Sequence, residues 1–268
     1  MTDLNRYLNV DEVETLLSNL AATVPSLCQL IELPNRTFEG RSCHAVRLRN
    51  GPADNRPAIA FTGGMHASEW GSCEILYNVA ADLLGAFTEN KGLQYGGATF
   101  LDSDIQKILN RLDVLIFPLV NPDGRHHSQI HYADPDGMWR KNRNPANSGG
   151  RAECIGIDIN RNFDFLFDFT NTFSPLSKIK DYVSTDPCDY LVYHGPTPFS
   201  EPETKNVRFL FDSNPAIRWF IDVHSYSEDI LFSWSDDDSQ SGDPTMNFRN
   251  PAFNGKRGVP NDGAYGEF

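Results

Sequence analysis

Apolar residues recur along this chain with two alternating spacings. In residues 10–24 they return every three or four positions, which predicts an amphipathic helix ending near Pro25. Residues 69–87 and 104–110 follow the same spacing and predict two further helices. Short apolar runs between these segments predict strands at residues 30–33, 44–48, 57–62, 114–117 and 216–223, and we expect the strands at 57–62 and 216–223 to be buried.

A further helix is predicted after residue 200. Ser200-Glu201-Pro202-Glu203 has the spacing of a capping box with an early proline, so this helix should run towards Phe211. Strands therefore alternate with helices, which predicts an α/β fold with a mixed, largely parallel sheet and helices on both faces. Since no repeat or linker divides the chain, we expect one domain over residues 1–268.

Two short polar segments, far apart in the sequence, follow predicted strands. His66 and Glu69 come directly after the strand at residues 57–62, and His224 ends the strand at 216–223. Side chains three apart on a helical turn share a face, and sites in α/β sheets gather at the carboxyl ends of strands. Two imidazoles and a carboxylate are a ligand set for hydrolytic zinc with one open position. Taken singly, His66 fits a surface histidine, Glu69 a first-turn acid and His224 a hydrogen-bonded strand-end histidine.

Several motifs between and around these residues occur in a distinctive order. After the strand at 114–117 comes Asn121-Pro122-Asp123-Gly124, then Trp139-Arg140-Lys141-Asn142-Arg143. Gly156-Ile157-Asp158-Ile159-Asn160-Arg161-Asn162-Phe163 and His224-Ser225-Tyr226-Ser227 follow. This ordered set resembles the zinc carboxypeptidases of the carboxypeptidase A/B type, from about Tyr7 to the chain end.

The resemblance implies a role for each matching residue. It implies a zinc metallocarboxypeptidase that binds one Zn²⁺ ion and removes C-terminal residues from peptides by metal-promoted attack of water. Without the resemblance, Arg140 fits a solvated basic cluster, and Asn160-Arg161 fits a turn with a surface ion pair. The implied roles are metal ligation by His66, Glu69 and His224, oxyanion stabilisation by Arg140, binding of the substrate carboxylate by Asn160 and Arg161, and lining of outer subsites by Ser225 and Tyr226.

The chain also departs from the pattern that it resembles. The family's general-base glutamate and its substrate-capping tyrosine come well after the third zinc ligand, on late elements of the domain. Here the polar residues 225–268 follow His224, and Tyr265 and Glu267 have no strand context, so neither is assigned these roles. Ser68 stands where many relatives carry an arginine. We therefore expect a zinc carboxypeptidase-like catalytic domain that is incomplete at its C-terminal end, with its specificity pocket outside this sequence.

Two other functions remain open on the sequence. One is a zinc amidohydrolase that acts on N-acyl amino acids, because such an enzyme would use similar ligands and a carboxylate-binding arginine. The other is a catalytically silent, zinc-containing module that binds peptides, which the unassigned general base favours. Hydrolysis of peptides compared with acylated amino acids would separate the first from a carboxypeptidase, and binding without turnover would identify the second.

The cysteines bear on the compartment. The resemblance implies a disulfide between Cys154 and Cys188, as in secreted members of the family, and two reduced thiols are the alternative. Cys28, Cys43 and Cys73 fit small core residues. The first residues show no signal-peptide pattern. We expect an extracytoplasmic or secreted protein, with a cytoplasmic location as the alternative.

Composition limits the partners. The 23 basic and 36 acidic residues give a net charge of −13, which argues against nucleic acid and anionic membranes. No apolar stretch reaches the roughly 18 residues of a membrane span. The resemblance implies peptide or protein C-termini as partners, and we expect a monomer.

Overall fold

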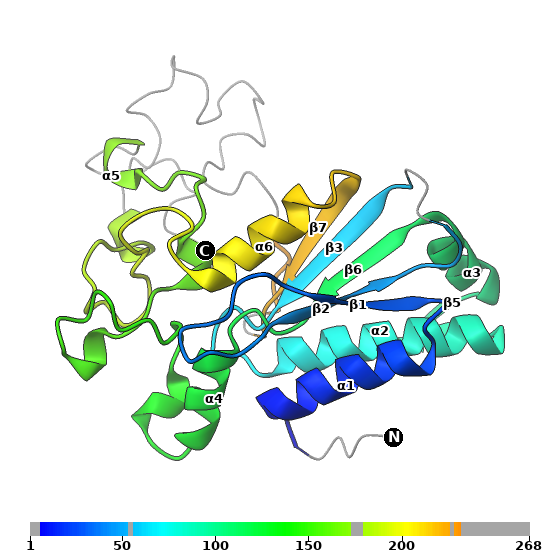
Figure 1. Cartoon of the computed structure of the whole chain (residues 1–268), viewed down its shortest axis with the longest axis horizontal. Coiled ribbons are helices and arrows are strands. Elements are labelled where there is room, and N and C mark those ends of the chain that lie inside the picture. The colour runs from blue at the N-terminus through cyan, green and yellow to red at the C-terminus, as the bar shows by residue number, and fades with distance from the viewer. Residues whose placement is uncertain (1–5, 53–55, 173–178, 226–227, 232–268) are drawn as a thin grey trace.

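The computed structural model describes residues 6–52, 56–172, 179–225 and 228–231. Five strands form one sheet in the order β1-β2-β6-β3-β7 (Figure 1). Strand β2 runs antiparallel to both β1 and β6, whereas β6, β3 and β7 run parallel to one another. The predicted mixed sheet is thus confirmed. Its strands are β1 (Cys28–Glu32), β2 (His44–Leu48), β3 (Ala58–Gly63), β6 (Asp113–Phe117) and β7 (Ile217–Val223).

Helices cover both faces of the sheet, as predicted. On one face lie α1 (Val10–Thr23) and α2 (Gly71–Glu89), and α3 (Asp102–Arg111) packs beside α2 (Figure 1). On the other face lies α6 (Pro202–Asp212).

The central strand β6 shows why two layers of helices are needed. Its residues alternate between two apolar clusters, one shared with α1 and α2 and one shared with α6. Val114 and Ile116 belong to the first cluster and Leu115 and Phe117 to the second, and each is at most 2% exposed. A strand that is buried on both faces reads as a continuous apolar run, which is the pattern found in the sequence.

Several elements were not predicted. A hairpin of β4 (Leu93–Tyr95) and β5 (Ala98–Phe100) forms a separate two-stranded sheet. Helix α4 (Pro122–Ile130) begins at the Asn-Pro-Asp-Gly motif, where the side chain of Asn121 accepts a hydrogen bond from the backbone N–H of Gly124. The short elements are η1 (Pro135–Met138), η2 (Ala152–Cys154), η3 (Ile159–Arg161), α5 (Phe169–Thr172) and η4 (Ile179–Asp181).

The predicted capping box at residues 200–203 is wrong. The N-cap of α6 is Glu201, which makes no side-chain cap hydrogen bond, although Pro202 does occupy the first turn. The Ser200 hydroxyl instead donates to Glu201, and the Glu203 carboxylate turns into the interior and accepts a hydrogen bond from Asn142. Glu201 and Glu203 are both buried and accept hydrogen bonds from the side chain of Asn142, and the N-cap residue Glu201 makes no side-chain cap hydrogen bond.

The prediction that the strand at 216–223 is buried is also wrong. Trp219, Phe220 and Ile221 are about half exposed, at 54%, 46% and 47%. Strand β7 lies at the edge of the sheet and pairs with β3 among the described strands, so one side of it lacks a neighbouring strand there. The apolar sequence of this strand does not reveal its place at the edge.

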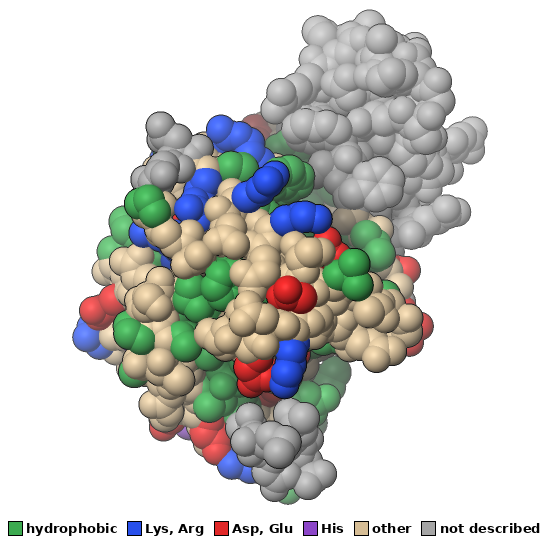
Figure 2. All heavy atoms as spheres, turned by 90° about the vertical axis from the view of Figure 1, so that its right-hand side faces the viewer, with side chains coloured by type: hydrophobic (Ala, Val, Ile, Leu, Met, Phe, Trp, Pro, Cys, Tyr) green, Lys and Arg blue, Asp and Glu red, His purple; other side chains and the backbone are tan. Residues whose placement is uncertain are grey.

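The amino ends of the parallel strands are rich in arginine. Asp113, the first residue of β6, has one oxygen 3.4 Å from Nη1 of Arg49 and 3.5 Å from Nε of Arg47. Figure 2 shows Lys and Arg side chains gathered over the upper part of this end of the molecule. The metal-ligand candidates follow the opposite ends of β3 and β7.

The structure confirms the expected disulfide and the expected burial of the other three cysteines. Cys154 and Cys188 form a disulfide, and Cys28, Cys43 and Cys73 are free and buried. Within the part of the chain that the structure describes, no helix combines the length and the hydrophobicity needed to span a membrane.

Candidate metal centre

Two adjacent parallel strands position the three candidate ligands. In the sheet register Gly63, the last residue of β3, lies opposite Val223, the last residue of β7. Gly64 then turns the chain with φ of +64°, a conformation that favours glycine. The following residues carry His66 towards His224, which directly follows β7. The ends of two paired strands therefore bring together histidines that are 158 residues apart.

The three candidate ligands converge on one point. Nδ1 of His66 lies 2.7 Å from Oε1 of Glu69, and Nδ1 of His224 lies 2.8 Å from Oε2 of the same carboxylate. The two Nδ1 atoms are 3.0 Å apart. The ligand atoms of this set all lie within 4.8 Å of one another, and no other such group of three occurs in the described residues.

The outer ring nitrogen of each imidazole faces a carboxylate. Nε2 of His224 lies 2.7 Å from Oδ2 of Asp222, and the other oxygen of Asp222 accepts a hydrogen bond from Thr62. Nε2 of His66 lies 3.4 Å from Oδ1 of Asp158, which is fully buried. A carboxylate on the outer nitrogen fixes the tautomer of a metal-binding histidine and raises its basicity.

These two acids were not predicted as site residues from the sequence. Asp222 lies in β7 two residues before His224, which directly follows the strand. Side chains two apart in an extended chain share a face, so this spacing was an available signal. Asp158 is 92 residues away from His66 in the sequence, and the fold alone shows that they are neighbours.

The electrostatics of the site favour a cation at the point of convergence. Burial acts to raise the pKa of Glu69, but hydrogen bonds with His224 and His66 outweigh it and hold that pKa far below its usual range. Burial acts to lower the pKa of His224, but Asp222 and Glu69 outweigh it and raise the pKa to about 10. The carboxylates thus hold positive charge on the His224 imidazole, and a metal ion would displace that proton.

The donor set fits a zinc ion. Ligand nitrogens and oxygens lie about 2.0–2.1 Å from tetrahedral zinc, hence about 3.3 Å from one another. The separations of 2.7–3.0 Å between the facing atoms of His66, Glu69 and His224 need to widen by only a few tenths of an ångström. Two imidazoles and one carboxylate also suit zinc chemically and leave a fourth position for water or substrate.

Arg140 lies at the edge of this centre. Its Nε donates to Oδ2 of Asp158 over 3.0 Å, and its Nη1 lies 4.0 Å from Oε1 of Glu69. The backbone N–H of Ala67 also donates to the Arg140 carbonyl oxygen. The Arg140 side chain is 22% exposed, so it is anchored at one nitrogen and still reachable from solvent.

Asn160 and Arg161 lie on the η3 turn that follows Asp158. The backbone N–H of Asn160 donates to Oδ1 of Asp158, the oxygen that faces His66. Nε of Arg161 donates to the carbonyl oxygen of Tyr182 over 2.6 Å. One buried carboxylate therefore links a candidate metal ligand, Arg140 and the turn that carries the candidate carboxylate-binding pair.

Of the two residues predicted to line the outer subsites, Ser225 and Tyr226, the structure describes only Ser225. The backbone N–H of Ser225 donates to Oε2 of Glu69 at 3.4 Å, so Ser225 lies beside the centre. Tyr226 lies outside the described residues, as do Tyr265 and Glu267.

A buried polar network supports the loop that carries Arg140. Nδ2 of Asn142 donates to Glu201 at 2.7 Å and to Glu203 at 3.1 Å, and Nδ2 of Asn144 donates to both oxygens of Glu201. Gly156 approaches this loop so closely that a Cβ atom would lie 2.2 Å from the Asn142 carbonyl oxygen. Glu201 and Glu203, at the start of α6, therefore hold the loop that carries Arg140 in place through hydrogen bonds to Asn142 and Asn144.

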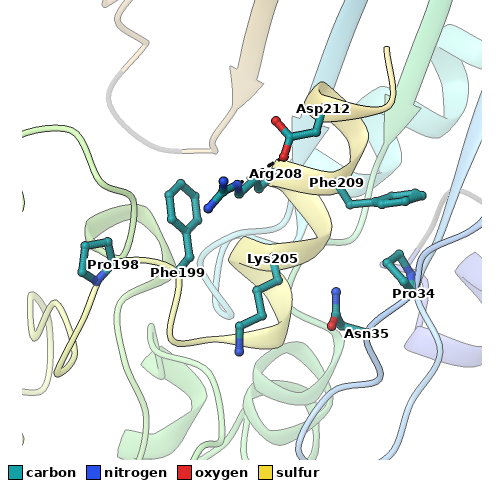
Figure 3. Close-up of a pocket in the computed structure, with 8 residues that line it drawn as sticks. All are labelled: Pro34, Asn35, Pro198, Phe199, Lys205, Arg208, Phe209 and Asp212. Atoms are coloured by element: carbon teal, nitrogen blue, oxygen red, sulfur yellow. Dashed lines mark hydrogen bonds and ion pairs between the residues drawn. The ribbon is translucent and has the colours of Figure 1, made fainter. Parts of the chain in front are cut away.

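A hollow of about 490 Å³ opens elsewhere, between residues 34–35 and the outer side of α6. In Figure 3 the Arg208 guanidinium lies by the ring of Phe199, 5.0 Å from its centroid, and Arg208 also pairs with Asp212. None of the candidate metal ligands lines this hollow. It is therefore separate from the metal centre.

Comparison with known proteins agrees with this geometry. The sequence model of the family described as zinc carboxypeptidase matches residues 13–261. Carboxypeptidase A2 of Rattus norvegicus is 31% identical over 229 residues, which cover 85% of this chain and 46% of that protein. Inactive metallocarboxypeptidase ECM14 of Saccharomyces cerevisiae is 29% identical over 237 residues, which cover 86% of this chain and 48% of that protein.

The fold is also similar to that of a solved carboxypeptidase structure. Carboxypeptidase A from Helicoverpa armigera superposes with a TM-score of 0.62 and 26% identity, over 86% of this chain and 49% of that one. The chain spans about half the length of the relatives that it matches. The match to the family sequence, which covers most of the chain, shows that this protein belongs to the zinc carboxypeptidase family.

Proposed function

We propose that this protein is a zinc-dependent metallocarboxypeptidase that hydrolyses C-terminal residues from peptides. The convergence of His66, Glu69 and His224 beside Arg140 is the observation that carries this proposal. It combines a site for a divalent cation with a fixed guanidinium, and peptide hydrolysis needs both an activated water and a partner for the carbonyl oxygen.

His66, Glu69 and His224 would hold the ion. Bound there, zinc would act as a Lewis acid and lower the pKa of a coordinated water to about 7. Asp158 and Asp222 would keep both imidazoles oriented, because each carboxylate faces the outer ring nitrogen of one histidine. The ligands would then not need to reorganise when substrate arrives.

Arg140 would bind the carbonyl oxygen of the scissile bond and stabilise the negative charge that develops on it. Its Nε is already occupied by Asp158, so the rest of the guanidinium is pre-oriented at the edge of the centre. Loss of one such donor typically costs about 3–4 kcal/mol of transition-state stabilisation.

Asn160 and Arg161 would bind the terminal carboxylate of the peptide. A guanidinium suits a carboxylate because it can form two parallel hydrogen bonds. Nε of Arg161 donates to the Tyr182 carbonyl oxygen, which fixes the side chain from one side. Recognition of a free carboxylate would restrict cleavage to the chain end, with Ser225 and Tyr226 beside the outer residues of the substrate.

A catalytically silent protein that binds peptides is the second candidate. One observation favours it: one relative is described as an inactive metallocarboxypeptidase. The ligand set and the carboxylate-binding residues would serve binding equally well.

The disulfide supports a compartment outside the cytoplasm. Bonds such as Cys154–Cys188 persist in oxidising environments and are rare in the cytosol. We therefore propose an extracytoplasmic or secreted protein whose partners are peptide and protein C-termini, and which acts as a monomer.

One preparation tests both candidates. Zinc per chain is measured first, and release of C-terminal residues is then measured on peptides that differ in their last side chain, with amidated peptides as matched controls. Zinc binding with cleavage of free C-termini alone supports the carboxypeptidase. Zinc with peptide binding but no release supports the silent protein. Retention of zinc in a His66→Ala/His224→Ala variant would contradict the metal centre itself.

A further inference from the structure

We propose that Lys141 is a positioning residue for the recognition of the substrate's terminal carboxylate. From inside the protein it holds the loop of residues 182–194, and this loop in turn holds Arg161. The inference deepens the proposed function and rests on the role proposed there for Asn160 and Arg161. Lys141 is 1% exposed, so it acts from behind the site and does not contact the peptide.

The ammonium group of Lys141 is buried and committed to the loop. It donates to the backbone carbonyl oxygens of Pro187 and Asp189, each over 3.0 Å. Burial lowers the pKa of Lys141 to about 8, against the opposing charges of Asp189 and Asp158. Burying a charged group costs free energy unless hydrogen bonds compensate, so the position of the ammonium depends on these two carbonyl groups.

The two carbonyl groups lie in the middle of the loop, on either side of a disulfide cysteine. Cys188 stands between Pro187 and Asp189 in the sequence and is bonded to Cys154. The disulfide and the ammonium therefore anchor the same short segment, one through a covalent bond and the other through hydrogen bonds.

Hydrogen bonds within the loop connect this anchored middle to both ends. Oδ1 of Asp189 accepts the backbone N–H groups of Leu191 and Val192, each over 2.9 Å. The N–H of Ser184 donates to the Val192 carbonyl oxygen, and the N–H of His194 donates to the Ser184 carbonyl oxygen. The middle of the loop and its two ends thus form one connected unit.

Both ends of the loop bind the η3 turn and the residue before it. At one end, Nε of Arg161 donates to the carbonyl oxygen of Tyr182 over 2.6 Å. At the other end, the backbone N–H of Asp158 donates to the carbonyl oxygen of Tyr193 over 2.8 Å. The loop therefore holds the segment that carries the candidate carboxylate-binding pair at two separate points.

The residue after Arg161 is bound to the same loop. Nδ2 of Asn162 donates to the carbonyl oxygen of His194 over 2.9 Å. A guanidinium forms two parallel hydrogen bonds with a carboxylate only when it is correctly oriented. Because Nε of Arg161 is tied to the loop, a displacement of the loop would turn the guanidinium away from the position in which it binds the terminal carboxylate.

Lys141→Met is the variant that tests this role. Methionine is unbranched and flexible, so it can fill the buried space, but it cannot donate to the two carbonyl oxygens. Lys107→Met is the matched control, because it makes the same substitution on α3, where the ammonium pairs with Asp104. Both variants are prepared as zinc-loaded protein, and equal zinc content is verified before each measurement.

The first measurement is hydrogen exchange followed by mass spectrometry, without substrate. We expect faster exchange in residues 158–162 and 182–194 of Lys141→Met, and unchanged exchange in both segments of Lys107→Met. Faster exchange confined to residues 182–194 would show that the loop does not hold the η3 turn and would overturn the proposal. This result does not depend on hydrolysis or on peptide binding.

The second measurement compares peptides with free and amidated C-termini by calorimetry. Their last amide bond is replaced by a methylene-amine group, so they bind without being cleaved. Lys141→Met should weaken binding of the free peptide by about tenfold or more and leave the amidated peptide unchanged, because only the free carboxylate uses Arg161. Equal losses for both peptides would indicate a general structural defect and overturn the proposal. Equal affinities of the unaltered protein for the two peptides would instead contradict the proposed function, and the exchange data would still decide whether Lys141 positions Arg161.

Asp189→Ala provides the test if Lys141→Met does not fold. It removes the acceptor of two N–H groups in the loop and leaves the buried ammonium in place. The same two segments should exchange faster, to a smaller extent, and the preference for the free peptide should fall. Unchanged exchange of residues 158–162 in this variant would also overturn the proposal.

Discussion

Asp158 accepts a hydrogen bond of 3.0 Å from Nε of Arg140. Its other oxygen lies 3.4 Å from Nε2 of His66 and accepts the N–H of Asn160. Asp158 is fully buried, so desolvation opposes its charge, yet its bonds to His66 and the nearby Arg140 and Arg161 hold its pKa far below the usual range. This single carboxylate therefore couples the metal centre to the guanidinium beside it.

Replacing Asp158 with asparagine should weaken zinc binding and also disturb the position of Arg140. The amide cannot hold both the His66 imidazole and the Arg140 guanidinium as a carboxylate does, so zinc affinity should fall about 10- to 100-fold. Zinc affinity is measured by competition with a chromogenic chelator, and the position of Arg140 by hydrolysis at saturating zinc.

Asp222→Asn is the matched comparison for that prediction. Asp222 contacts His224 and Thr62, whereas no contact joins it to Arg140. It should weaken zinc binding by a similar factor and leave the rate at saturating zinc nearly unchanged. Equal rates for Asp158→Asn and Asp222→Asn at saturating zinc would show that Asp158 does not position Arg140.

Replacing Arg140 with lysine should reduce hydrolysis but not metal binding. Lysine has one compact charge, so it cannot bind Asp158 and a carbonyl oxygen with separate nitrogens as the guanidinium can. We expect kcat/KM to fall by about 10²–10³-fold. Steady-state kinetics on a preparation that cleaves peptides gives this value, and metal analysis should show unchanged zinc. Arg208→Lys, on the outer side of α6, is the control and should keep full activity.

How much of the fold was predictable depended on the strength of each pattern. The strand at residues 44–48 was predicted with the bounds that the structure shows, and α1 ends within one residue of its prediction. Helix α4 was missed because it is nine residues long, polar and begins with proline. The exposure of β7 was missed because an apolar run does not show whether its strand lies in the centre or at the edge of a sheet.

The candidate site, too, could be predicted only in part from the sequence. His66, Glu69 and His224 could be paired from the sequence because each follows an apolar strand, and parallel strands end at one edge of a sheet. Asp158 could not be placed, because its segment belongs to no strand and its neighbour His66 is distant in the sequence. The buried acids Glu201 and Glu203 read as a helix cap, since local spacing does not show which carboxylates the tertiary structure will bury.

Removal of the disulfide should lower stability. Cys154 and Cys188 are 34 residues apart, and closing a loop of that size in the unfolded chain is worth about 3–4 kcal/mol. The Cys154→Ala/Cys188→Ala variant should therefore unfold at lower urea concentration, as followed by circular dichroism. Cys73→Ala is a poor control because Cys73 is buried, so the unaltered protein with and without a reductant serves instead. No change in the midpoint on reduction would contradict the expectation.

Glu203 should make stability depend on pH. Burial and the neighbouring Glu201 raise the pKa of Glu203 to about 8, and its Oε1 has no hydrogen-bond partner among the described residues. The folded protein therefore holds a proton that the unfolded chain releases near pH 4.5, so the contribution of Glu203 is full below pH 4.5 and is lost as the pH rises towards 8.

Glu203→Gln should remove this dependence, because glutamine stays neutral and keeps an acceptor for Asn142. One unit of pKa difference is worth about 1.4 kcal/mol, so from pH 5 to pH 8 the variant should gain at least about 1 kcal/mol in stability relative to the unaltered protein. Urea unfolding with a chelator present at both pH values gives this difference without any contribution from bound metal. Glu153→Gln, an exposed acid, should show no such gain, and a parallel response of the two variants would mean that Glu203 is ionised throughout this range.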